Sequence, residues 1–337
     1  MDAGGSWRRR WTAFRSSPYL PACVMAVLIA AAAGLFAGSY TYAMANPTPR
    51  HIPTAVTGLP IGRAQRDRFV VGMEKALGAA LELHHYDDLA GARNAVEDQK
   101  VFAILQERGP GRSPQLFVSS ASGSSVAQLL AQTAPRVSAQ QGLRIAVHDL
   151  NPLQKGDPRG LALFYVSLAA VIIGFLGAIQ LSVNAKGLKR QELIAFVVGY
   201  SLLGAFAIAA TVDWLLGALR LPFTESWLIL AFTMFTSGMV FMMFNSVFGR
   251  WAVVPTWGVL VLLGNPSSGG AVSWPLLPSV LGRIGRWLPP GANVNAQHTA
   301  VYFHSRQHVF PFAVLAVWAA VATAVFWFWP RRTPAAQ

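Results

Sequence analysis

The residue types in this sequence that could support chemistry are few, and the most suggestive group is a short basic turn. Lys186, Lys189, Arg190 and Glu192 fall within residues 182–192, between two long apolar stretches. Cations beside a carboxylate on a solvent-facing turn could dock on a partner subunit such as a separate ATPase. The alternative is a basic turn with no partner, because Lys and Arg collect in the cytoplasmic loops of membrane proteins.

Two polar residues, Asp213 and Asn245, lie near the ends of apolar stretches. A carboxylate in lipid is costly, so it is a functional candidate by default. Because Asp213 is close to the end of its stretch, we expect an interfacial carboxylate paired with Arg220. A proton-linked or substrate-linked role is the alternative. We expect Asn245 to cap a helix or to pack between helices.

Motifs for catalysis and for nucleotide binding are absent from the sequence. It contains no Gly-x-x-x-x-Gly-Lys-Ser/Thr loop, no Gly-x-Ser-x-Gly elbow and no His-Glu-x-x-His helix. We therefore predict no enzymatic activity and no cofactor in this chain, and any ATP-driven role needs another subunit. The seven histidines, with His298, His304 and His308 closest to a cluster, are expected to be solvated loop residues rather than zinc ligands.

The composition indicates a membrane protein. Hydrophobic residues make up 53% of the 337 residues and charged residues 12%, against about 25% charged in soluble domains. The residues without charge form continuous stretches, as in membrane spans. The net charge of +13 forms no continuous basic stripe, so we expect a lipid bilayer as partner and no nucleic acid.

The apolar stretches predict a polytopic α-helical membrane protein with about six transmembrane helices. Residues 1–18 read as a cytoplasmic amphipathic segment. The stretch at 251–263 is too short to cross a core of about 30 Å unaided. The six predicted spans are 19–44, 161–181, 193–216, 227–247, 251–263 and 309–329.

The first stretch allows two interpretations. Its length favours an uncleaved anchor, whereas Ala43, Met44 and Ala45 fit the small-residue rule for signal-peptide cleavage. A cleaved first segment would leave the other five spans oriented in the same way.

Two polar regions separate the spans. Residues 46–158 alternate expected strands and helices, which predicts an extracytoplasmic α/β domain between the first two spans. Residues 264–308 are rich in Pro and Gly but also apolar, so we expect an extracytoplasmic segment that re-enters the bundle.

The distribution of Arg and Lys predicts the orientation in the cell membrane. Basic residues cluster in 1–18, in 182–192, at Arg250 and at Arg331 and Arg332, whereas 217–226 has Arg220 alone. This asymmetry predicts that the N- and C-termini are cytoplasmic.

Three short motifs then carry a family resemblance. They are Asp157, Pro158, Arg159 and Gly160 before the second span; Asn265, Pro266, Gly269 and Gly270 after the short fifth span; and Pro289, Pro290 and Gly291 before the last span. On these motifs and on its order of elements, nearly the whole chain resembles the ABC-2-type permease-like membrane proteins of actinobacteria, which are related to the phage-infection-protein-type family.

The resemblance implies an exporter permease subunit that forms a homodimer and works with a separate ATP-binding subunit. The motifs look structural, so no catalytic residue is carried over. An apolar or amphipathic substrate, such as a lipid, a drug or an envelope component, is expected. The alternative function is a non-transporting envelope scaffold or surface receptor that uses its extracytoplasmic domain, and a membrane-embedded enzyme ranks third.

Overall fold

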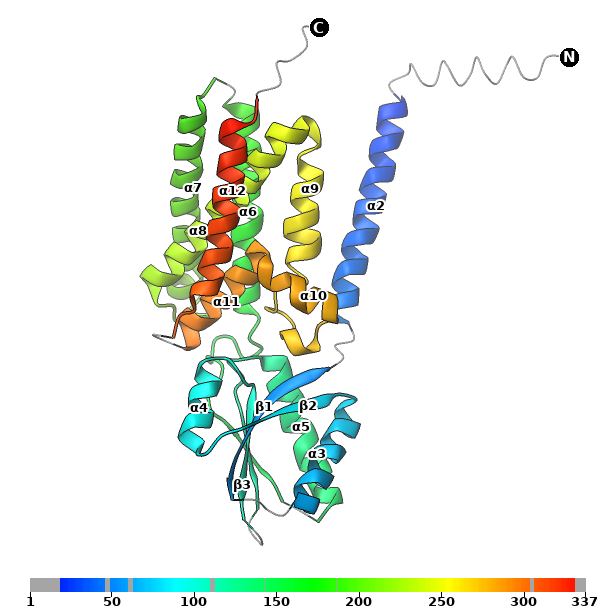
Figure 1. The fold of residues 1–337 in the computed structure, drawn as a ribbon. Coiled ribbons are helices and arrows are strands. Elements are labelled where there is room, and N and C mark those ends of the chain that lie inside the picture. The colour runs from blue at the N-terminus through cyan, green and yellow to red at the C-terminus, as the bar shows by residue number, and fades with distance from the viewer. Residues whose placement is uncertain are drawn as a thin grey trace, which may run out of the picture.

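The structure, a computed structural model, describes residues 19–45, 49–59, 63–109, 113–142, 144–185, 187–303 and 306–330. The amphipathic segment expected at 1–18, Lys186, His304 and the C-terminal arginines lie outside the described residues. The described chain is mostly helical, with a helical bundle at one end and a β-sheet at the other (Figure 1).

Among the residues that the structure describes, five helices are long and apolar enough to cross a membrane, as expected of a polytopic membrane protein. At the end of the third, the α-helix gives way to a π-helical turn, and the fourth continues into a 3-10 turn. The five are α2 (Tyr19–Met44), α6 (Ala162–Asn184), α7 (Arg190–Ala210) with the π turn η1 (Thr211–Leu215), α8 (Phe223–Phe248) with η2 (Gly249–Trp251), and α12 (Val309–Phe328).

The short fifth stretch forms a shorter helix. α9 (Val253–Trp257) continues into the π-helical η3 (Gly258–Gly264). At about 1.5 Å per residue, this run covers little more than half of an apolar core of about 30 Å. Irregular chain from Asn265 onward completes the path toward the sheet.

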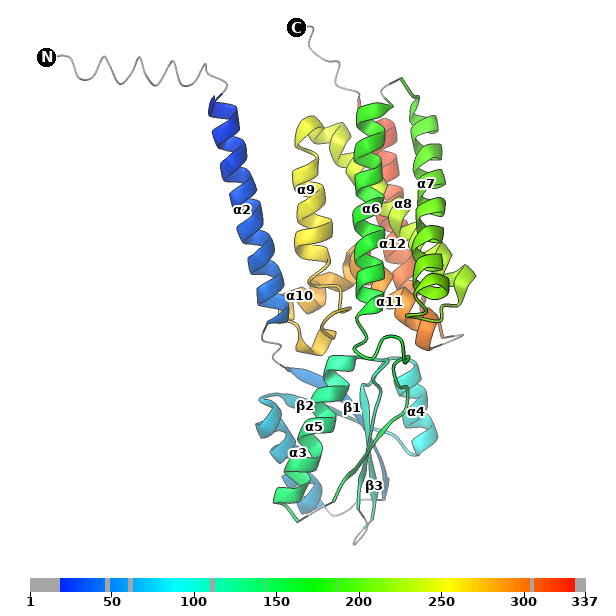
Figure 2. The same cartoon turned by 180° about the vertical axis from the view of Figure 1, so that it is seen from behind.

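α8 is the central helix of the bundle, packed against α6, α7 and α12 (Figures 1 and 2). Glycines permit this packing: a Cβ on Gly174 of α6 would lie 2.6 Å from the Met234 carbonyl oxygen of α8. The Tyr200 hydroxyl of α7 donates to the Gly174 carbonyl at 2.6 Å. Small residues that let backbones approach are the usual basis of helix packing in lipid.

α2 stands apart from the other long helices in both views (Figures 1 and 2). Of its residues only Ala43 is buried. One of its contacts with the bundle is aromatic, with Phe36 stacked on Trp257 at 6.2 Å between ring centroids. No atom lies within 4 Å of the position that a Cβ on Gly34 or on Gly38 would take, so this glycine pair packs on nothing in the described chain.

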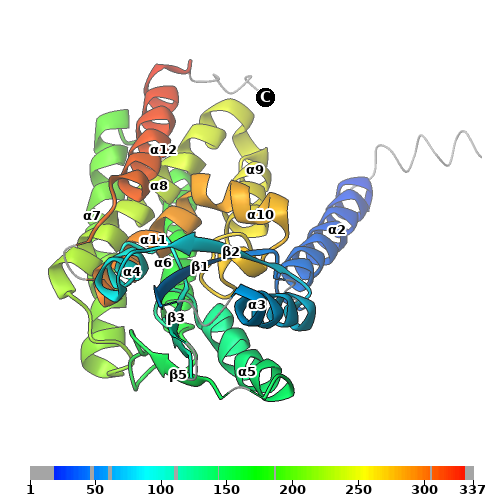
Figure 3. The same ribbon diagram turned by 60° about the horizontal axis from the view of Figure 1, so that its bottom comes forward.

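In the described part of the chain, the sheet has five strands in the order β2-β1-β3-β4-β5, parallel except between β3 and β4. One face packs on α3 and α5 and the other on α4 (Figure 3). Alternate residues of a strand point to opposite faces, so Ala103 and Leu105 pack in the core with α3 and α5, whereas Ile104 packs in the core with α4. The elements are β1 (His51–Leu59), α3 (Arg63–Leu77), β2 (Ala80–His85), α4 (Leu89–Glu97), β3 (Ala103–Arg108), β4 (Gln115–Val118), α5 (Ser124–Gln140) and β5 (Ala146–Asp149).

One strand of the sheet differs from the sequence pattern. The pattern predicts a helix over 66–83, whereas α3 ends at Leu77 and residues Ala80–His85 form β2. Gly78 has φ +66°, the left-handed conformation that commonly ends a helix. Asp88 is a helix-start residue in the sequence, and in the structure its carboxylate accepts from the Gly91 N–H at 2.7 Å and caps α4.

The segment 264–308 contains more helix than its prolines indicate. The apolar residues of 276–288 predict one short amphipathic helix, whereas the structure has η4 (Trp274–Leu276), α10 (Ser279–Ile284) and η5 (Gly285–Trp287). A further helix, α11 (Pro289–Tyr302), is almost wholly buried. Prolines at its first turn cost no hydrogen bond, because those N–H groups have no partner within the helix.

Candidate functional site

The basic turn expected to meet an ATPase is partly used within the chain itself. The Arg190 guanidinium donates to the carbonyl of Trp327 and, at 2.6 Å, to that of Trp329, so it holds the end of α12. The Glu192 carboxylate accepts from the Lys189 N–H at 2.7 Å and caps α7. Lys189 is exposed and is the described cation of this turn that a partner can reach.

Asp213 and Asn245 lie at opposite ends of the bundle. Asp213 is half-buried in the π turn η1. The pairing expected with Arg220 is not formed in the described chain, where Arg220 is exposed and bonds through its backbone to Gln154. The Asn245 carbonyl accepts from the Gly249 N–H at the end of α8, so Asn245 takes part in the helix end through its backbone.

The first family-like motif begins α6. The Asp157 carboxylate is buried and accepts from the N–H groups of Leu161 at 3.0 Å and Ala162 at 2.8 Å. A carboxylate here satisfies N–H groups that have no partner within the helix. Gly160 has φ +68° and completes the turn, whereas Pro158 and Arg159 are exposed.

The second and third motifs pack against each other. The turn that contains Asn265, Pro266, Gly269 and Gly270 lies against η5 and the first turn of α11. A side chain at Gly285 would clash with the Ser267 carbonyl, and one at Gly291 would clash with the Gly285 carbonyl.

The first motif is connected to the second and third motifs through α6, the helix that it begins. A Cβ on Gly270 would lie 3.2 Å from the Phe164 side chain of α6. A Cβ on Gly264 would lie 2.7 Å from Pro290. The structure therefore brings the Asn265–Gly270 and Pro289–Gly291 stretches into one packed unit, with Asp157 at the start of the helix they contact.

α11 brings polar side chains into this unit. Gln297 is fully buried and donates from Nε2 to the Ser226 carbonyl of α8 at 2.8 Å. One helical turn away, Asn293 is also fully buried, and both its amide oxygen and its amide nitrogen have no partner among the described residues. A buried amide without a partner is costly and calls for a bound polar group or water. Neither residue is among the candidate site residues predicted from the sequence, although Pro289 and Pro290 together are a helix-start signal.

His298 lies where α11 meets the sheet end, so the expectation of a solvated loop residue is wrong for this histidine. It lines a small cavity of about 30 Å³ together with Gln99, Phe102 and Trp274. Burial lowers the pKa of His298 to about 4, so the ring is neutral at pH 7. No group of three metal-binding side chains occurs in the part of the chain that the structure describes.

The sheet end is bonded to the bundle by polar contacts. Arg306 pairs with Asp98 at 2.7 Å and with Glu97 at 3.1 Å at the end of α4. Gln99 donates to the Thr299 hydroxyl at 2.7 Å. Because these contacts join α4 to α11 and to the start of α12, the sheet and α11 are held together.

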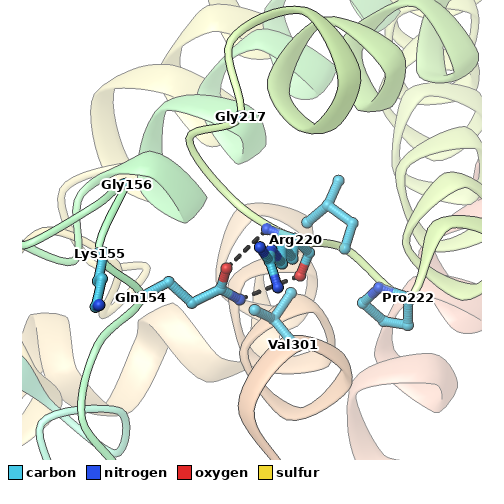
Figure 4. A pocket seen from close by; sticks show the side chains of 8 residues that line it. Gln154, Lys155, Gly156, Gly217, Arg220, Pro222 and Val301 are labelled. Carbon is cyan, nitrogen blue, oxygen red and sulfur yellow. Dashed lines mark hydrogen bonds between the residues drawn. The ribbon is translucent and has the colours of Figure 1, made fainter.

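Two larger cavities open at this junction. One of about 430 Å³ is lined by Trp274, Arg286, Trp287 and Phe310 among others, with the Arg286 guanidinium 5.2 Å from the Trp274 ring centroid. The other, of about 670 Å³, is lined by residues of the 154–156 turn, the 217–222 turn and Val301 of α11 (Figure 4).

The geometry assembles a polar, partly unsatisfied helix inside an apolar bundle, with two cavities beside it. Such an arrangement can hold a molecule that has both polar and apolar parts. Comparison with models of known protein families, with characterised proteins and with solved structures finds no match to this chain.

Proposed function

We propose that this protein is the permease-like subunit of an exporter that moves an apolar or amphipathic molecule and is driven by a separate ATPase. The observation that carries the proposal is Asn293, a fully buried amide whose oxygen and nitrogen both lack a partner among the described residues. It sits on α11 beside a helix, α9 with η3, that ends part of the way along the bundle.

Interrupted helices and buried polar groups are how transporters build a substrate site within an apolar bundle. Irregular backbone at membrane depth is tolerated where protein or an aqueous cavity surrounds it. Here Asn265 and Pro266, directly after η3, are buried. In the proposed permease, the Asn293 amide binds the polar part of a passing molecule.

The proposed orientation puts the sheet outside the cytoplasm in the cell membrane. In the structure α2 enters the sheet, α6 leaves it, and α12 begins beside Arg306, so these helix ends share one end of the bundle (Figure 1). The basic turns at Lys189 and Arg250 lie at the ends away from the sheet, as the positive-inside tendency requires. Both chain termini are then cytoplasmic.

The coupling surface for the ATPase is proposed to centre on Lys189. Arg190 and Glu192 are engaged in capping contacts, and Lys186 lies outside the described residues. Lys189 therefore offers the cleanest test of coupling, because replacing Arg190 would also release the end of α12.

The test compares efflux in cells that carry the chain, lack it, or carry Asn293→Leu. A panel of fluorescent amphipathic dyes and short-chain fluorescent phospholipids is loaded, and retained fluorescence is followed. We expect cells that lack the chain to retain more of at least one probe than cells that carry it. Cells that carry Asn293→Leu should retain as much of that probe as cells that lack the chain, although the variant is present in the membrane at the wild-type amount. Unchanged retention of every probe, together with no ATPase on gentle purification, would refute the proposal.

The alternative is a non-transporting envelope scaffold or surface receptor. It requires the sheet and its helices to work as a tethered binding module. The bonds from Arg306 to Asp98 and from Gln99 to Thr299 hold this part to the bundle, which favours the permease. Deleting 50–155 discriminates between them, since a scaffold loses its partner while efflux is unchanged.

A homodimer is part of the proposal. The Gly34 and Gly38 surface of α2 has no neighbour within the described chain, and a small-xxx-small pair lets two helices approach closely in lipid. A second copy of α2 fits this surface.

A further inference from the structure

The 670 Å³ groove between the 154–156 turn and the 217–222 turn is shaped by specific contacts between these turns. Gln154 bonds the 217–222 turn twice: its amide oxygen accepts from the Arg220 N–H at 2.7 Å, and its Nε2 donates to the Arg220 carbonyl at 3.1 Å (Figure 4). A Cβ on Gly156 would lie 2.5 Å from the Ala218 carbonyl oxygen. The two turns are therefore in close contact and set the shape of the groove.

The charge of the groove is positive. Lys155 and Arg220 line it and are both exposed. Two of the nearby carboxylates are engaged elsewhere: Asp157 caps α6, and Glu225 accepts from Gln307 at 2.8 Å. Asp213 sits in the preceding π turn and is not among the lining residues.

The floor and one rim of the groove are apolar. Leu221, Pro222 and Val301 line it beside the two cations. The π turn leading into it exposes Leu215 at 77% and Trp214 at 63%. Side chains this apolar are stable at such exposure when lipid covers them.

An aromatic cluster places this region at the membrane boundary. Trp214 stacks on Phe223 at 4.5 Å, and Phe206 contacts both rings edge-on. The Trp227 indole donates to the Leu202 carbonyl at 2.9 Å. Trp and other aromatic residues gather where the apolar core meets the headgroups, and cations beside them lie at the level of lipid phosphates.

We propose that this groove is a binding site for an anionic phospholipid of the leaflet nearest the sheet. The phosphate lies between Lys155 and Arg220, and the acyl chains run along the apolar floor and the exposed face at Trp214 and Leu215. This site is independent of transport, so it can be tested without knowing the exported molecule.

The test measures lipid retention by native mass spectrometry on the full chain in detergent, with phosphatidylglycerol or phosphatidylcholine added in equal amounts. We expect phosphatidylglycerol to be retained preferentially. The double variant Lys155→Gln, Arg220→Gln keeps the backbone bonds of Arg220 to Gln154. It is expected to lower phosphatidylglycerol retention by on the order of 10-fold. The matched control Lys189→Gln, Arg250→Gln removes two cations from the other end of the bundle and is expected to leave this preference unchanged.

A second variant separates a shaped site from diffuse charge. Gln154→Leu keeps both cations but loses both bonds to Arg220 and is expected to weaken retention about threefold through lost preorganisation. Inorganic phosphate at millimolar concentration is added as the competitor that lacks acyl chains. The proposal is overturned if the groove double variant retains phosphatidylglycerol as the wild type does, or if the control variant loses as much. It is also overturned if inorganic phosphate displaces the lipid completely, since the site then reads the anion alone.

Discussion

The Asp98 carboxylate lies 2.7 Å from the Arg306 guanidinium, and this ion pair joins α4 of the sheet to the start of α12. Lys100 adds a second cation at 3.1 Å. The Arg306 and Lys100 hydrogen bonds hold the pKa of Asp98 below its usual range. The junction therefore depends on a charge that persists into mildly acidic solution.

Asp98→Asn is expected to lower the stability of the folded protein by about 1 kcal/mol at pH 7, a modest value because both side chains are partly exposed. A carboxyl group whose pKa is lower in the folded state stabilises above its unfolded pKa and loses that contribution as pH falls through the folded pKa. The difference between wild type and variant should therefore be complete at pH 7 and shrink below about pH 4. Thermal unfolding in detergent across this range measures it, and a difference that grows as pH falls would contradict the assignment.

Asp157 is expected to stabilise the start of α6. Asp157→Ala removes the acceptor for two N–H groups and should cost about 1–2 kcal/mol. Asp157→Asn keeps one amide oxygen and should cost less. Arg159→Gln is the matched control, because Arg159 in the same turn is exposed. Thermal unfolding of the three variants should follow this order.

The packing of the second and third motifs predicts intolerance of a single methyl group. Gly285→Ala and Gly291→Ala would drive a Cβ into carbonyl groups of neighbouring turns, with an expected cost of about 3 kcal/mol. Gly199→Ala is the control, because nothing lies within 4 Å of a Cβ there. Equal thermal stability of Gly285→Ala and Gly199→Ala would show that these turns are not packed together.

Variants of Arg190 and Lys189 in the basic turn should have different effects, the first on the stability of α12 and the second on coupling to the proposed ATPase. Arg190→Gln loses the bonds to Trp327 and Trp329 and should raise proteolytic cleavage near the end of α12. Lys189→Glu should leave that cleavage unchanged and weaken co-purification of the proposed ATPase. If Lys189→Glu retains the ATPase fully, the coupling surface is elsewhere.

The proposed α2 dimer can be probed with Cys23, the single cysteine of the chain, which is exposed on α2. Cys23 lies about three helical turns before Gly34, and so on the same face. A bismaleimide should link two copies in membranes, and Cys23→Ser should abolish the link. Replacing Gly34 and Gly38 by Leu should reduce the linked fraction, whereas Leu at Ala32 and Ala33, which lie away from the face of the two glycines, controls for bulk alone.

The apolar spans were predictable because membrane helices must satisfy every backbone group internally and be long enough to cross. Phe69 and Met73 likewise mark the buried face of α3, and both are in the core. β2 was missed because Leu81 and Leu83 continue the helical spacing of α3. A single Gly78 was the signal that the helix ends.

The candidate site was less predictable, because its contacts join residues far apart in sequence. Nothing local to Gln154 indicates that its amide reaches Arg220, 66 residues later. Likewise, the Asp213 charge predicts a cation partner, whereas the Arg220 side chain is exposed and only the Arg220 backbone bonds, to Gln154. α11 was hidden by its polar composition, because a buried helix without an apolar stripe lacks the periodicity on which recognition depends.

Because Gln154 bonds to the backbone N–H and carbonyl of Arg220, the shape of the groove and its charge depend on different groups. A neutral amide fixes the distance between the two turns, and the exposed side chains at 155 and 220 supply the charge. Evolution can therefore exchange those two side chains, and with them the sign of the headgroup that is preferred, without rebuilding the scaffold beneath.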